Sequence, residues 1–428
     1  MRTISKSRKP LRGELTAEAD KSISHRAVII SALARGESVI RNFLLAADTL
    51  SSYTCMEQLG VQISRQDSLL RVMGKGLEGL QEPTEVLNCG NSGTTMRLLT
   101  GLLSARPFFS VLSGDRSLNR RPMERIISPL SSMGAQIFAR GQGHFPPLAV
   151  NGSRLKGIDY TLPVASAQLK SALLLAALTA EGETIISEPQ KSRDHTERML
   201  RAMGARIELV GQRIRLCPEA ELSPQEFIVP GDISSAAFFI VAATILPGSE
   251  LLIRGVGINP SRSGIIDILV QMGAKIKLEN KKVISGEPVA DLIVSHSQLK
   301  AVEVEGDMVP RLIDELPVLA VAMAVASGTS IVHDAQELKV KESDRIETIT
   351  GELKKMGVPA HATQDGFIIE GGAGPLIGSR VNSHGDHRIA MSLAVAALLA
   401  EGQSVISNPQ AVDISFPAFW QELERLSQ

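Results

Sequence analysis

The sequence predicts an α/β fold made of six repeats of one module, divided into two domains of three repeats. Six apolar stretches of helical length follow one another along the 428 residues, most of them closed by small residues and a glycine. They are Ala27–Gly36, Leu98–Arg106, Leu169–Gly182, Ala236–Gly248, Leu316–Gly328 and Ile389–Gly402. A second marker, Leu/Met-Gly-Val/Ala, recurs at intervals of roughly 70 residues, with its glycine at Gly60, Gly134, Gly204, Gly273 and Gly357. Two periodic signals in step indicate tandem copies of one module.

Each module is expected to contain two helices and several strands. The apolar stretch predicts the first helix, and the glycine marker ends the second. A final helix over Phe416–Leu426 completes the sixth copy. Alternating β-branched stretches such as 38–41 and Thr184–Ser187 predict strands between the helices.

Length alone favours about three domains of ~150 residues, but six modules divide more naturally into two groups of three. We expect one domain over 21–230 and a second over 1–20 together with 231–428. A stretch punctuated by proline and glycine, from Glu221 to Gly231, is the predicted crossover. The first strand, Leu11–Ala19, could belong to either domain.

The composition predicts an ordinary globular protein of the cytoplasm. Apolar residues make up 43% of the chain, and the formal net charge is −1, so the general positive field of nucleic-acid-binding proteins is absent. The three cysteines are odd in number and widely spaced, which fits a reducing compartment. The basic N-terminus is followed by no apolar segment of a signal peptide, and no apolar run approaches the ~18 residues of a membrane span. We therefore expect no leader, no membrane and no nucleic acid.

A polar cluster precedes or opens each apolar stretch. Ser, Thr, Asn and Lys at the start of a buried helix direct N–H groups and cations at one spot, which suits phosphate and carboxylate groups. Helix capping is the competing interpretation of each cluster, and Asp232–Ser235 is expected to cap only. Gly90–Thr95 lacks the Gly-Lys-Ser/Thr of a phosphate-binding P-loop. The clusters are 20–26, 90–97, 165–168, 231–235, 314–315 and 386–388.

Connecting loops add further arginines and lysines among Gly, Ser and Asp, at 114–123, 192–196 and 339–345. Such a charge run is usually a solvated surface, but several at corresponding places in the modules indicate a small polyanion held by planar guanidinium groups. His384 and His387 flank Asp386 in a spacing that loosely resembles a metal site. No further Cys/His set supports one, so no metal is expected.

These clusters together resemble the 5-enolpyruvylshikimate-3-phosphate synthase family, over essentially the whole chain and in family order. The motifs are Lys21-Ser22-x-Ser24-x-Arg26, Gly90-Asn91-Ser92-Gly93-Thr94-Thr95-Met96-Arg97, Arg121-Pro122-Met123, Ser166-Ala167-Gln168, Asp314-Glu315-Leu316-Pro317, Lys341-Glu342-Ser343-Asp344-Arg345 and Asp386-His387-Arg388-Ile389-Ala390-Met391. Within the family, His25, Thr94-Thr95 and 192–195 resemble the glyphosate-tolerant branch.

The resemblance implies a two-domain inside-out α/β barrel, with six βαβαββ repeats, three per domain, around pseudo-threefold axes and an active site in the interdomain cleft. It implies a monomeric enzyme of the shikimate pathway, leading to chorismate and the aromatic amino acids. The enolpyruvyl group of phosphoenolpyruvate would pass to the 5-hydroxyl of shikimate 3-phosphate through a tetrahedral intermediate, with release of phosphate. No cofactor or metal is implied, and glyphosate would compete with phosphoenolpyruvate.

Carried over position by position, the resemblance assigns three catalytic groups. Asp314 would exchange the proton of the 5-hydroxyl, while Lys21 and Glu342 would exchange a proton with the methylene carbon. The shikimate 3-phosphate contacts would be Ser22, Arg26, Ser166, Gln168, Arg193 and Lys341. The phosphoenolpyruvate contacts would be Lys21, Asn91, Gly93, Thr94, Arg121, Gln168, Arg345, His387 and Arg388.

One departure and two alternatives remain open. Many relatives have a lysine before the Ser/Thr-Phe-Pro of the last helix, where this chain has Ile414. A UDP-N-acetylglucosamine enolpyruvyl transferase would share the repeat, but relatives of that kind carry a reactive cysteine in a loop that here, Gly114–Arg121, has none. A repeat protein that only binds an anionic metabolite would have no use for the carboxylates Asp314 and Glu342.

Overall fold

The computed structural model describes residues 1–218 and 221–427, so 219, 220 and 428 of the expected domain ranges lie outside it. The chain forms two compact units. We call residues 19–229 with 284–287 the N-terminal unit, and residues 1–18, 230–283 and 288–428 the C-terminal unit. Each unit has its own hydrophobic core.

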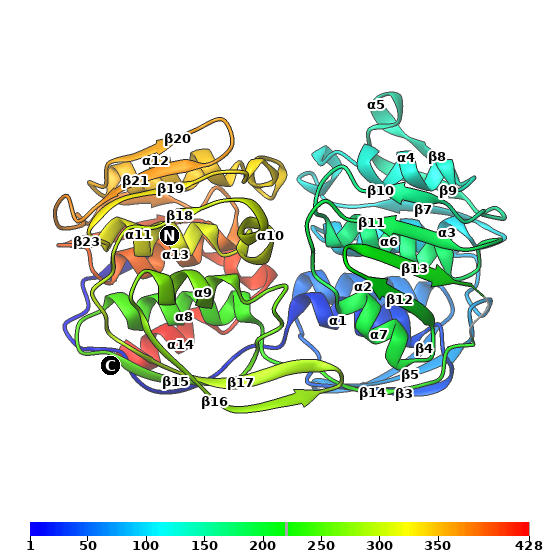
Figure 1. Ribbon diagram of the computed structural model, residues 1–428, viewed down its shortest axis with the longest axis horizontal. Helices are drawn as coiled ribbons and strands as arrows, with labels where there is room; N and C mark the ends of the chain where they lie inside the picture. Colours follow the sequence, from blue (N-terminus) through cyan, green and yellow to red (C-terminus); the bar gives the residue numbers. More distant parts are fainter. Residues whose placement is uncertain (219–220, 428) are drawn as a thin grey trace. The chain divides into compact units, whose positions relative to one another are not determined.

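The N-terminal unit contains three four-stranded sheets and the helices that they cover (Figure 1). Its elements are α1 (Lys21–Ser31), β3 (Arg35–Arg41), α2 (Ala47–Gln58), β4 (Gln62–Gln66), β5 (Leu69–Lys75), β6 (Leu87–Asn88), α3 (Gly93–Ser104), β7 (Phe109–Ser113), the 3₁₀ helix η1 (Leu118–Arg120), α4 (Glu124–Ser132), β8 (Gln136–Ala139), α5 (Arg140–Gly143), β9 (Phe145–Asn151), β10 (Asp159–Thr161), α6 (Ala167–Ala177), β11 (Thr184–Ser187), α7 (His195–Ala202), β12 (Arg206–Val210), β13 (Arg213–Cys217) and β14 (Glu226–Ile228).

The C-terminal unit contains two four-stranded sheets and one three-stranded sheet. Its elements are β1 (Arg2–Ser5), β2 (Arg12–Thr16), α8 (Ile233–Ile245), β15 (Glu250–Gly257), α9 (Gly264–Gln271), β16 (Lys275–Ile284), β17 (Glu287–Ser295), β18 (Glu303–Val304), the 3₁₀ helix η2 (Gly306–Met308), α10 (Val309–Leu312), α11 (Leu316–Val325), β19 (Gly328–Val332), the 3₁₀ helix η3 (Gln336–Val340), α12 (Arg345–Lys355), β20 (Ala360–Ala362), β21 (Phe367–Gly371), β22 (Arg380–Asn382), α13 (His387–Ala397), β23 (Gln403–Ser407), the 3₁₀ helix η4 (Pro409–Ile414) and α14 (Phe419–Ser427).

Five of the six sheets share one strand order, and the three-stranded sheet lacks the outermost strand; this recurrence confirms the predicted repeat. In the order β6-β7-β9-β8, the first pair is parallel and the other two pairs are antiparallel. The same pattern holds for β10-β11-β13-β12 and β18-β19-β21-β20. In chain order each of these copies reads βαβαββ.

Two strands, β2 and β14, pair with sheets whose other strands are far away in sequence. β2 precedes α1 along the chain but pairs in parallel with β15, whereas β14 precedes α8 but pairs in parallel with β3. The strand expected over Leu11–Ala19 is β2, and it belongs to the C-terminal unit. The three-stranded sheet, β1-β23-β22, takes its antiparallel strand from the start of the chain.

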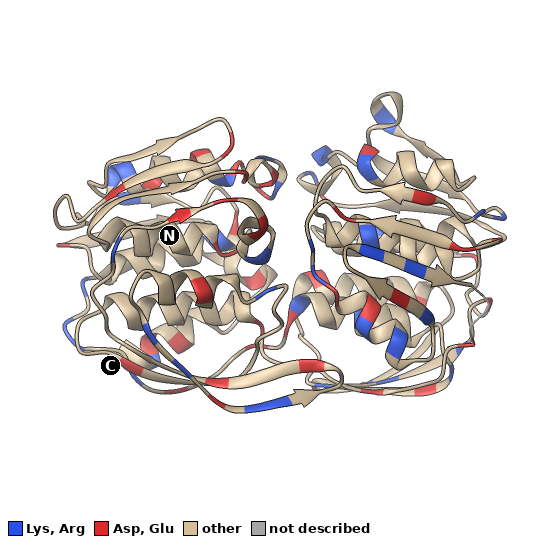
Figure 2. Cartoon of the chain, in the orientation of Figure 1, with Lys and Arg blue, Asp and Glu red and all other residues tan. Residues whose placement is uncertain are grey.

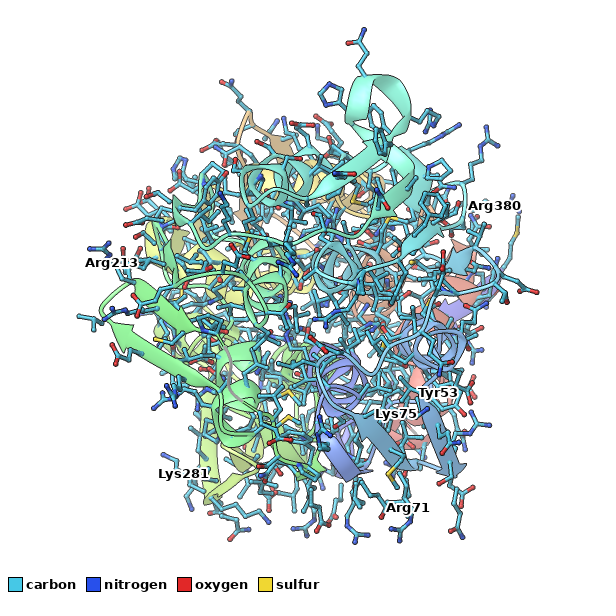
Figure 3. All side chains as sticks on the ribbon, turned by 90° about the vertical axis from the view of Figure 1, so that its right-hand side faces the viewer. Tyr53, Arg71, Lys75, Arg213, Lys281 and Arg380 are labelled. Atoms are coloured by element: carbon cyan, nitrogen blue, oxygen red, sulfur yellow. The ribbon has the colours of Figure 1, made fainter. Side chains whose placement is uncertain are left out.

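The six predicted apolar stretches are the inner helices α1, α3, α6, α8, α11 and α13. Every residue of α8 and nine of the ten residues of α11 are buried. A helix that is apolar on every side has no face to present to water, so the sheets cover these helices from outside. The strands keep one face in solvent, as the alternating burial of β5 shows, and Arg71 and Lys75 of β5 and Arg213 of β13 extend outward from them (Figure 3). This is the inside-out arrangement that the sequence predicts.

The recurring Leu/Met-Gly-Val/Ala marker is the C-terminal cap of the second helix in five copies. Each of its glycines has a φ between 83° and 103°, a left-handed conformation that side chains rarely adopt. In each copy the N–H three residues past the last helical residue bonds back to the third carbonyl from the helix end, as Val61 does with Met56. The marker therefore repeats because each second helix ends by the same hydrogen-bonded turn.

The inner helices begin earlier than the apolar stretches predict. α1 starts at Lys21 rather than Ala27 and α3 at Gly93 rather than Leu98, because the polar cluster itself forms the first turn. The side chains of Asp20, Ser92, Ser166, Asp232 and Asp386 cap five of these helices by accepting a backbone N–H. The last helix begins at Phe419 rather than Phe416, since η4 precedes it.

Charged residues of both signs are distributed along both units (Figure 2), in keeping with the net charge of −1. None of the helices in the described part of the chain combines the length and hydropathy that a membrane crossing requires.

The inner helices α3 and α6 approach each other closely at Gly101. A Cβ on this residue of α3 would lie 2.2 Å from the backbone oxygen of Ala172 in α6, whereas a Cβ on Gly351 of α12 would meet nothing within 4 Å. Gly101→Ala must therefore push the two helices apart, and we expect it to lower the free energy of unfolding by about 1–3 kcal/mol.

The matched control is Gly351→Ala, which we expect to raise the free energy of unfolding by about 0.5–1 kcal/mol, because alanine is the better helix former. Urea denaturation of both variants measures the difference. Equal effects of the two substitutions would contradict the close packing of α3 against α6.

Candidate functional site

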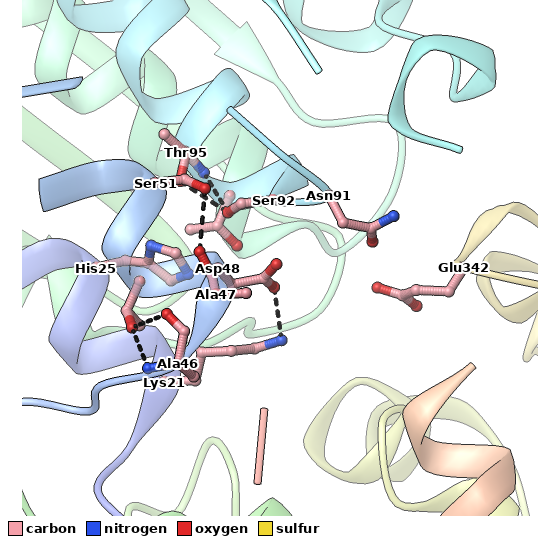
Figure 4. A network of polar contacts seen from close by, with 12 residues as sticks. Lys21, His25, Ala46, Ala47, Asp48, Ser51, Asn91, Ser92, Thr95 and Glu342 are labelled. Carbon is pink, nitrogen blue, oxygen red and sulfur yellow. Dashed lines mark hydrogen bonds and ion pairs between the residues drawn. The ribbon is translucent and has the colours of Figure 1, made fainter. Parts of the chain in front are cut away.

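In the N-terminal unit, the first turn of α1 carries the predicted catalytic lysine. Asp20 caps the helix by accepting the N–H of Ile23 at 2.8 Å. Lys21 is not a solvated lysine, because its Nζ lies 3.0 Å from Oδ2 of Asp48 and its side chain is only 17% exposed (Figure 4). Asp48, at the start of α2, therefore holds the ammonium group in place.

His25 lies one turn further along α1 and is completely buried. Burial, with smaller contributions from Lys21 and Arg26, lowers the pKa of its imidazole well below the usual value of 6.5. Its Nδ1 lies 2.8 Å from the hydroxyl of Ser52 in α2, which in turn contacts Thr95 of α3. The ring is thus a neutral member of a buried polar chain.

The first turn of α3 brings together most of the predicted phosphoenolpyruvate contacts of this unit. Gln168 donates to the hydroxyl of Thr94 at 2.9 Å and accepts from Arg97 at 2.5 Å. Arg121 donates to the side-chain oxygen of Asn91 at 2.6 Å. The turn, the α6 glutamine and the arginine after η1 therefore form one hydrogen-bonded group.

Gly93 opens α3 at the centre of this group. Its φ is not among the positive values of the chain, so the backbone does not require a glycine here. A Cβ at this position would lie 2.7 Å from Nη1 of Arg97 and 3.5 Å from Nη1 of Arg121. The absence of a side chain leaves room for two guanidinium groups.

The predicted shikimate 3-phosphate contacts of this unit lie at or just before the N-termini of α1, α6 and α7. Arg26 is 2% exposed and donates to Thr196, to the hydroxyl of Ser171 and to the carbonyl oxygen of Ser22. Ser166 caps α6 by accepting the N–H of Leu169. Of the remaining members, Ser22 and Arg193 are half-buried.

A buried ionic cluster that the sequence did not indicate supports the loop of Arg193. Lys170 of α6 is fully buried, with Nζ 3.0 Å from Glu188 and 2.7 Å from Glu197. Burial alone would lower the pKa of Lys170, but the two carboxylates outweigh it and raise that pKa. Because Glu188 also accepts from the backbone N–H and hydroxyl of Ser192, the cluster fixes the residue before Arg193.

In the C-terminal unit, Arg345 at the start of α12 is surrounded by three carboxylates. Its guanidinium is 1% exposed, donates to Asp386 at 2.8 Å and to Asp314 at 3.2 Å, and also contacts Glu342. Burial alone would lower the pKa of Arg345, but Asp386, Glu342 and Asp314 together raise it. Both predicted catalytic carboxylates of this unit therefore contact the same arginine.

Arg388, at the start of α13, approaches Asp314 from another side. Its Nη1 donates to the backbone oxygen of Asp314 at 3.0 Å, and its Nη2 lies 3.7 Å from Oδ2. Its Nη1 also lies 3.5 Å from Glu315, which accepts from Ser234 of α8. The carboxylate of Asp314 is thus held by two guanidinium groups.

The expectation that Asp232–Ser235 only caps α8 is wrong. Asp232 does cap the helix, yet its Oδ1 also accepts from Arg262 at 3.1 Å. Arg262 donates in addition to Ser234, the residue that contacts Glu315. The start of α8 therefore belongs to the same buried polar network as Asp314.

The other predicted members of this unit lie after η3 and at the start of α13. Lys341 follows η3 and is half-buried, and His387 is buried at the start of α13. Ile414, in the place of the family lysine, ends η4 and is half-buried. His384 contacts Glu352 at 2.7 Å, and across residues 1–218 and 221–427 no group of three His, Cys, Asp or Glu side chains could hold a metal ion.

Sequence reasoning missed several supporting residues. Asp48 and Ser52 stand in no motif, so only the packing of α2 against α1 reveals them. Arg97 and Asp386 do lie inside quoted motifs, yet nothing in those motifs indicated that they would hold Gln168 and Arg345. An ionisable residue near a motif indicates a supporting role only when it is known to be buried, and the sequence alone does not give its burial.

Comparison with known proteins identifies the family. A family model described as EPSP synthase (3-phosphoshikimate 1-carboxyvinyltransferase) matches residues 5–423. A protein of Syntrophomonas wolfei named 3-phosphoshikimate 1-carboxyvinyltransferase is 63% identical over 427 residues, which cover 100% of both chains. A protein of the same name from Carboxydothermus hydrogenoformans is 53% identical, again over 100% of both chains.

The solved structures agree with the sequence relatives. The EPSP synthase of Acinetobacter baumannii matches with a TM-score of 0.88 at 45% identity, covering 99% of this chain and 97% of that one. The enolpyruvyl transferase NikO from Streptomyces tendae matches with a TM-score of 0.80 at 19% identity, covering 99% of this chain and 96% of that one. At this low identity the match shows a similar fold only. With a family model spanning nearly the whole chain and relatives above half identity, the chain belongs to the EPSP synthase (3-phosphoshikimate 1-carboxyvinyltransferase) family.

Proposed function

We propose that the chain performs the family's reaction through the residues placed above. As a member of this family it transfers the enolpyruvyl group of phosphoenolpyruvate to the 5-hydroxyl of shikimate 3-phosphate and releases phosphate, a step of the shikimate pathway. The observation that carries the residue assignment is the position of Asp314, whose carboxylate contacts Arg345 and Arg388. Two guanidinium groups thus contact and orient the carboxylate that we assign as the general base.

Two acid–base exchanges make up the mechanism that we propose. Asp314 takes the proton of the 5-hydroxyl as its oxygen adds to C2 of phosphoenolpyruvate, and a proton passes to the methylene carbon. Lys21 and Glu342 are assigned to that second exchange. In the elimination that follows, Lys21 and Glu342 take a proton back from the methyl carbon, and the proton held by Asp314 passes to an oxygen of the departing phosphate, because the former 5-hydroxyl oxygen stays bonded to C2. Every atom of the products comes from the two substrates.

The binding roles follow from charge. Two phosphates and two carboxylates enter the site, and we assign Arg121, Arg345, Arg388, His387 and the Asn91–Thr94 turn with Gln168 and Lys21 to phosphoenolpyruvate. Ser22, Arg26, Ser166, Gln168, Arg193 and Lys341 are assigned to shikimate 3-phosphate. Arg26 and Arg345 are held by internal contacts, which supports a clamp that is oriented before the substrates arrive.

We extend the proposal to the finer family traits. His25, Thr94-Thr95 and 192–195 support membership of the glyphosate-tolerant branch, with glyphosate as an inhibitor. The division into two compact units supports the proposed domains 21–230 and 1–20 with 231–428, although residues 284–287 group with the N-terminal unit. One chain carries all the assigned residues, which supports a monomer, and its three cysteines are unbridged, as in the reducing cytoplasm.

Phosphate release with both substrates tests the proposal directly. We expect release that depends on shikimate 3-phosphate and does not occur when UDP-N-acetylglucosamine replaces it. Release with the nucleotide sugar would favour the other enolpyruvyl transferase. Binding of either anion without any release would favour a regulatory module.

Asp314→Asn tests the assigned base. We expect turnover to fall by at least ~10²-fold, the scale typical of losing a general base, while shikimate 3-phosphate binding stays within about tenfold. Steady-state kinetics and calorimetric titration measure the two effects. Asp159→Asn, which removes a carboxylate from an exposed pair with Arg213, is the matched control and should leave turnover unchanged. Near-normal turnover of Asp314→Asn would rule out the role.

Gly93→Ala tests the phosphoenolpyruvate turn. The added methyl would press on the guanidinium groups of Arg97 and Arg121. Glyphosate is longer than phosphoenolpyruvate and should be affected more, so we expect its inhibition to weaken by more than about tenfold, roughly 1.4 kcal/mol. The KM for phosphoenolpyruvate should rise by a smaller factor.

The melting temperature of Gly93→Ala serves as the control for folding and should stay near that of the parent chain, because the backbone of Gly93 is not strained. Equal losses for inhibitor and substrate, or a large drop in melting temperature, would defeat the argument from pocket size.

A further inference from the structure

Four buried side chains from α1, α2 and the start of α3 form a continuous hydrogen-bonded chain in the N-terminal unit. Nδ1 of His25 in α1 lies 2.8 Å from Oγ of Ser52 in α2. Ser52 Oγ lies 2.7 Å from Oγ1 of Thr95 in α3, and Thr95 Oγ1 lies 2.7 Å from Oγ of Ser92. All four residues are at most 1% exposed. The chain ends at the residue that caps α3.

The direction of this chain follows from proton counting. Ser92 Oγ accepts both the backbone N–H and the hydroxyl proton of Thr95. A threonine hydroxyl has one proton, so Thr95 can take part in its contact with Ser52 only as the acceptor. Ser52 must then donate to Thr95. Because the single hydroxyl proton of Ser52 is donated to Thr95, Ser52 Oγ can only accept the hydrogen bond from Nδ1 of His25.

His25 is therefore the first donor of the chain, with its proton on Nδ1. The ring is neutral, because burial and the neighbouring Lys21 and Arg26 disfavour a second proton. A neutral imidazole with the proton on Nδ1 has a bare Nε2. The contacts thus select one tautomer of one histidine.

We propose that this one-way chain from His25 through Ser52 and Thr95 to Ser92 fixes the first turn of α3, and that His25, Ser52 and Thr95 are positioning residues for the phosphoenolpyruvate turn Asn91–Thr94. The proposal rests on the residue roles assigned under Proposed function.

The geometry explains why such a device is useful at this place. Ser92 lies between Asn91 and Gly93, which contact or adjoin the guanidinium groups of Arg121 and Arg97. An ordinary cap, such as Asp20 on α1, needs one side chain alone. Here the cap is in addition tied to α1 and α2, the helices that carry Lys21 and Asp48. A shift of the turn relative to Lys21 would have to break a hydrogen bond between buried groups, which is costly.

The first experiment measures the tautomer. In ¹⁵N-histidine NMR spectra of the full chain, a protonated and a bare ring nitrogen differ widely in chemical shift, and the His25 signals are assigned by their loss in His25→Asn. We expect the proton on Nδ1 and a bare Nε2 from pH 7 to pH 8. A proton on Nε2 would overturn the direction of the chain, whatever the enzyme's activity.

The second experiment separates positioning from stability by two matched substitutions in α3. Thr95→Val removes the hydroxyl that links Ser52 to Ser92, whereas Thr100→Val removes a buried hydroxyl that bonds only the carbonyl of Met96 in its own helix. We expect Thr95→Val to raise the KM for phosphoenolpyruvate by about tenfold, with kcat and the KM for shikimate 3-phosphate within about twofold. Thr100→Val should change neither KM. Equal kinetic effects of the two variants would overturn the proposal.

Rescue at the other end of the chain completes the test. His25→Asn keeps an N–H donor close to the position of Nδ1 and should stay within about threefold of the parent KM for phosphoenolpyruvate, whereas His25→Leu should behave as Thr95→Val does. If His25→Leu does not fold, Thr95→Val still decides the outcome. His25→Asn with the full defect would contradict the role of the donor. An inactive parent enzyme would refute the proposed function instead, and the NMR result would still test the chain.

Discussion

The structure depends on the burial of helices that are apolar on every side. α8 and α11 have no polar face, so they can only be stable if other elements surround them. The six small sheets supply that cover, which is why the strands lie outside with one face in water. The polar groups of such helices are confined to their ends, and the first turns therefore become the places where side chains of opposite charge gather.

The same constraint determines the electrostatics of the candidate site. Cations placed at buried helix ends lose their hydration, which costs free energy unless a carboxylate or several acceptors compensate. Lys21 is paired with Asp48, and Arg345 with three carboxylates. Arg26 is held by hydroxyl and carbonyl oxygens instead. The groups assigned to the substrates are therefore oriented by the protein itself, so binding does not have to supply that order.

Repetition made the architecture predictable from the sequence, and exchange between copies limited the prediction. The glycine of each Leu/Met-Gly-Val/Ala marker recurs in the sequence because the end of each second helix requires a residue in the left-handed conformation. The exchange of β2 and β14 cannot be predicted in this way, because strand pairing between residues 187 and 238 positions apart leaves no local signal. The helices also begin earlier than the apolar stretches predict, because a polar capping cluster has the composition of a loop although its residues form the first helical turn.

The sequence by itself determined the repeat, the inner helices and the polar clusters at their ends, because these depend on local periodicity and local hydrogen-bonding chemistry. It also determined the family, since the motifs occur in order over the whole chain. Only the tertiary structure decided which partner each charged group has: Asp48 for Lys21, Gln168 for Arg97, and Asp386 for Arg345. These pairs join residues from different helices, and the distances between them follow from the packing of the cores rather than from spacing along the chain.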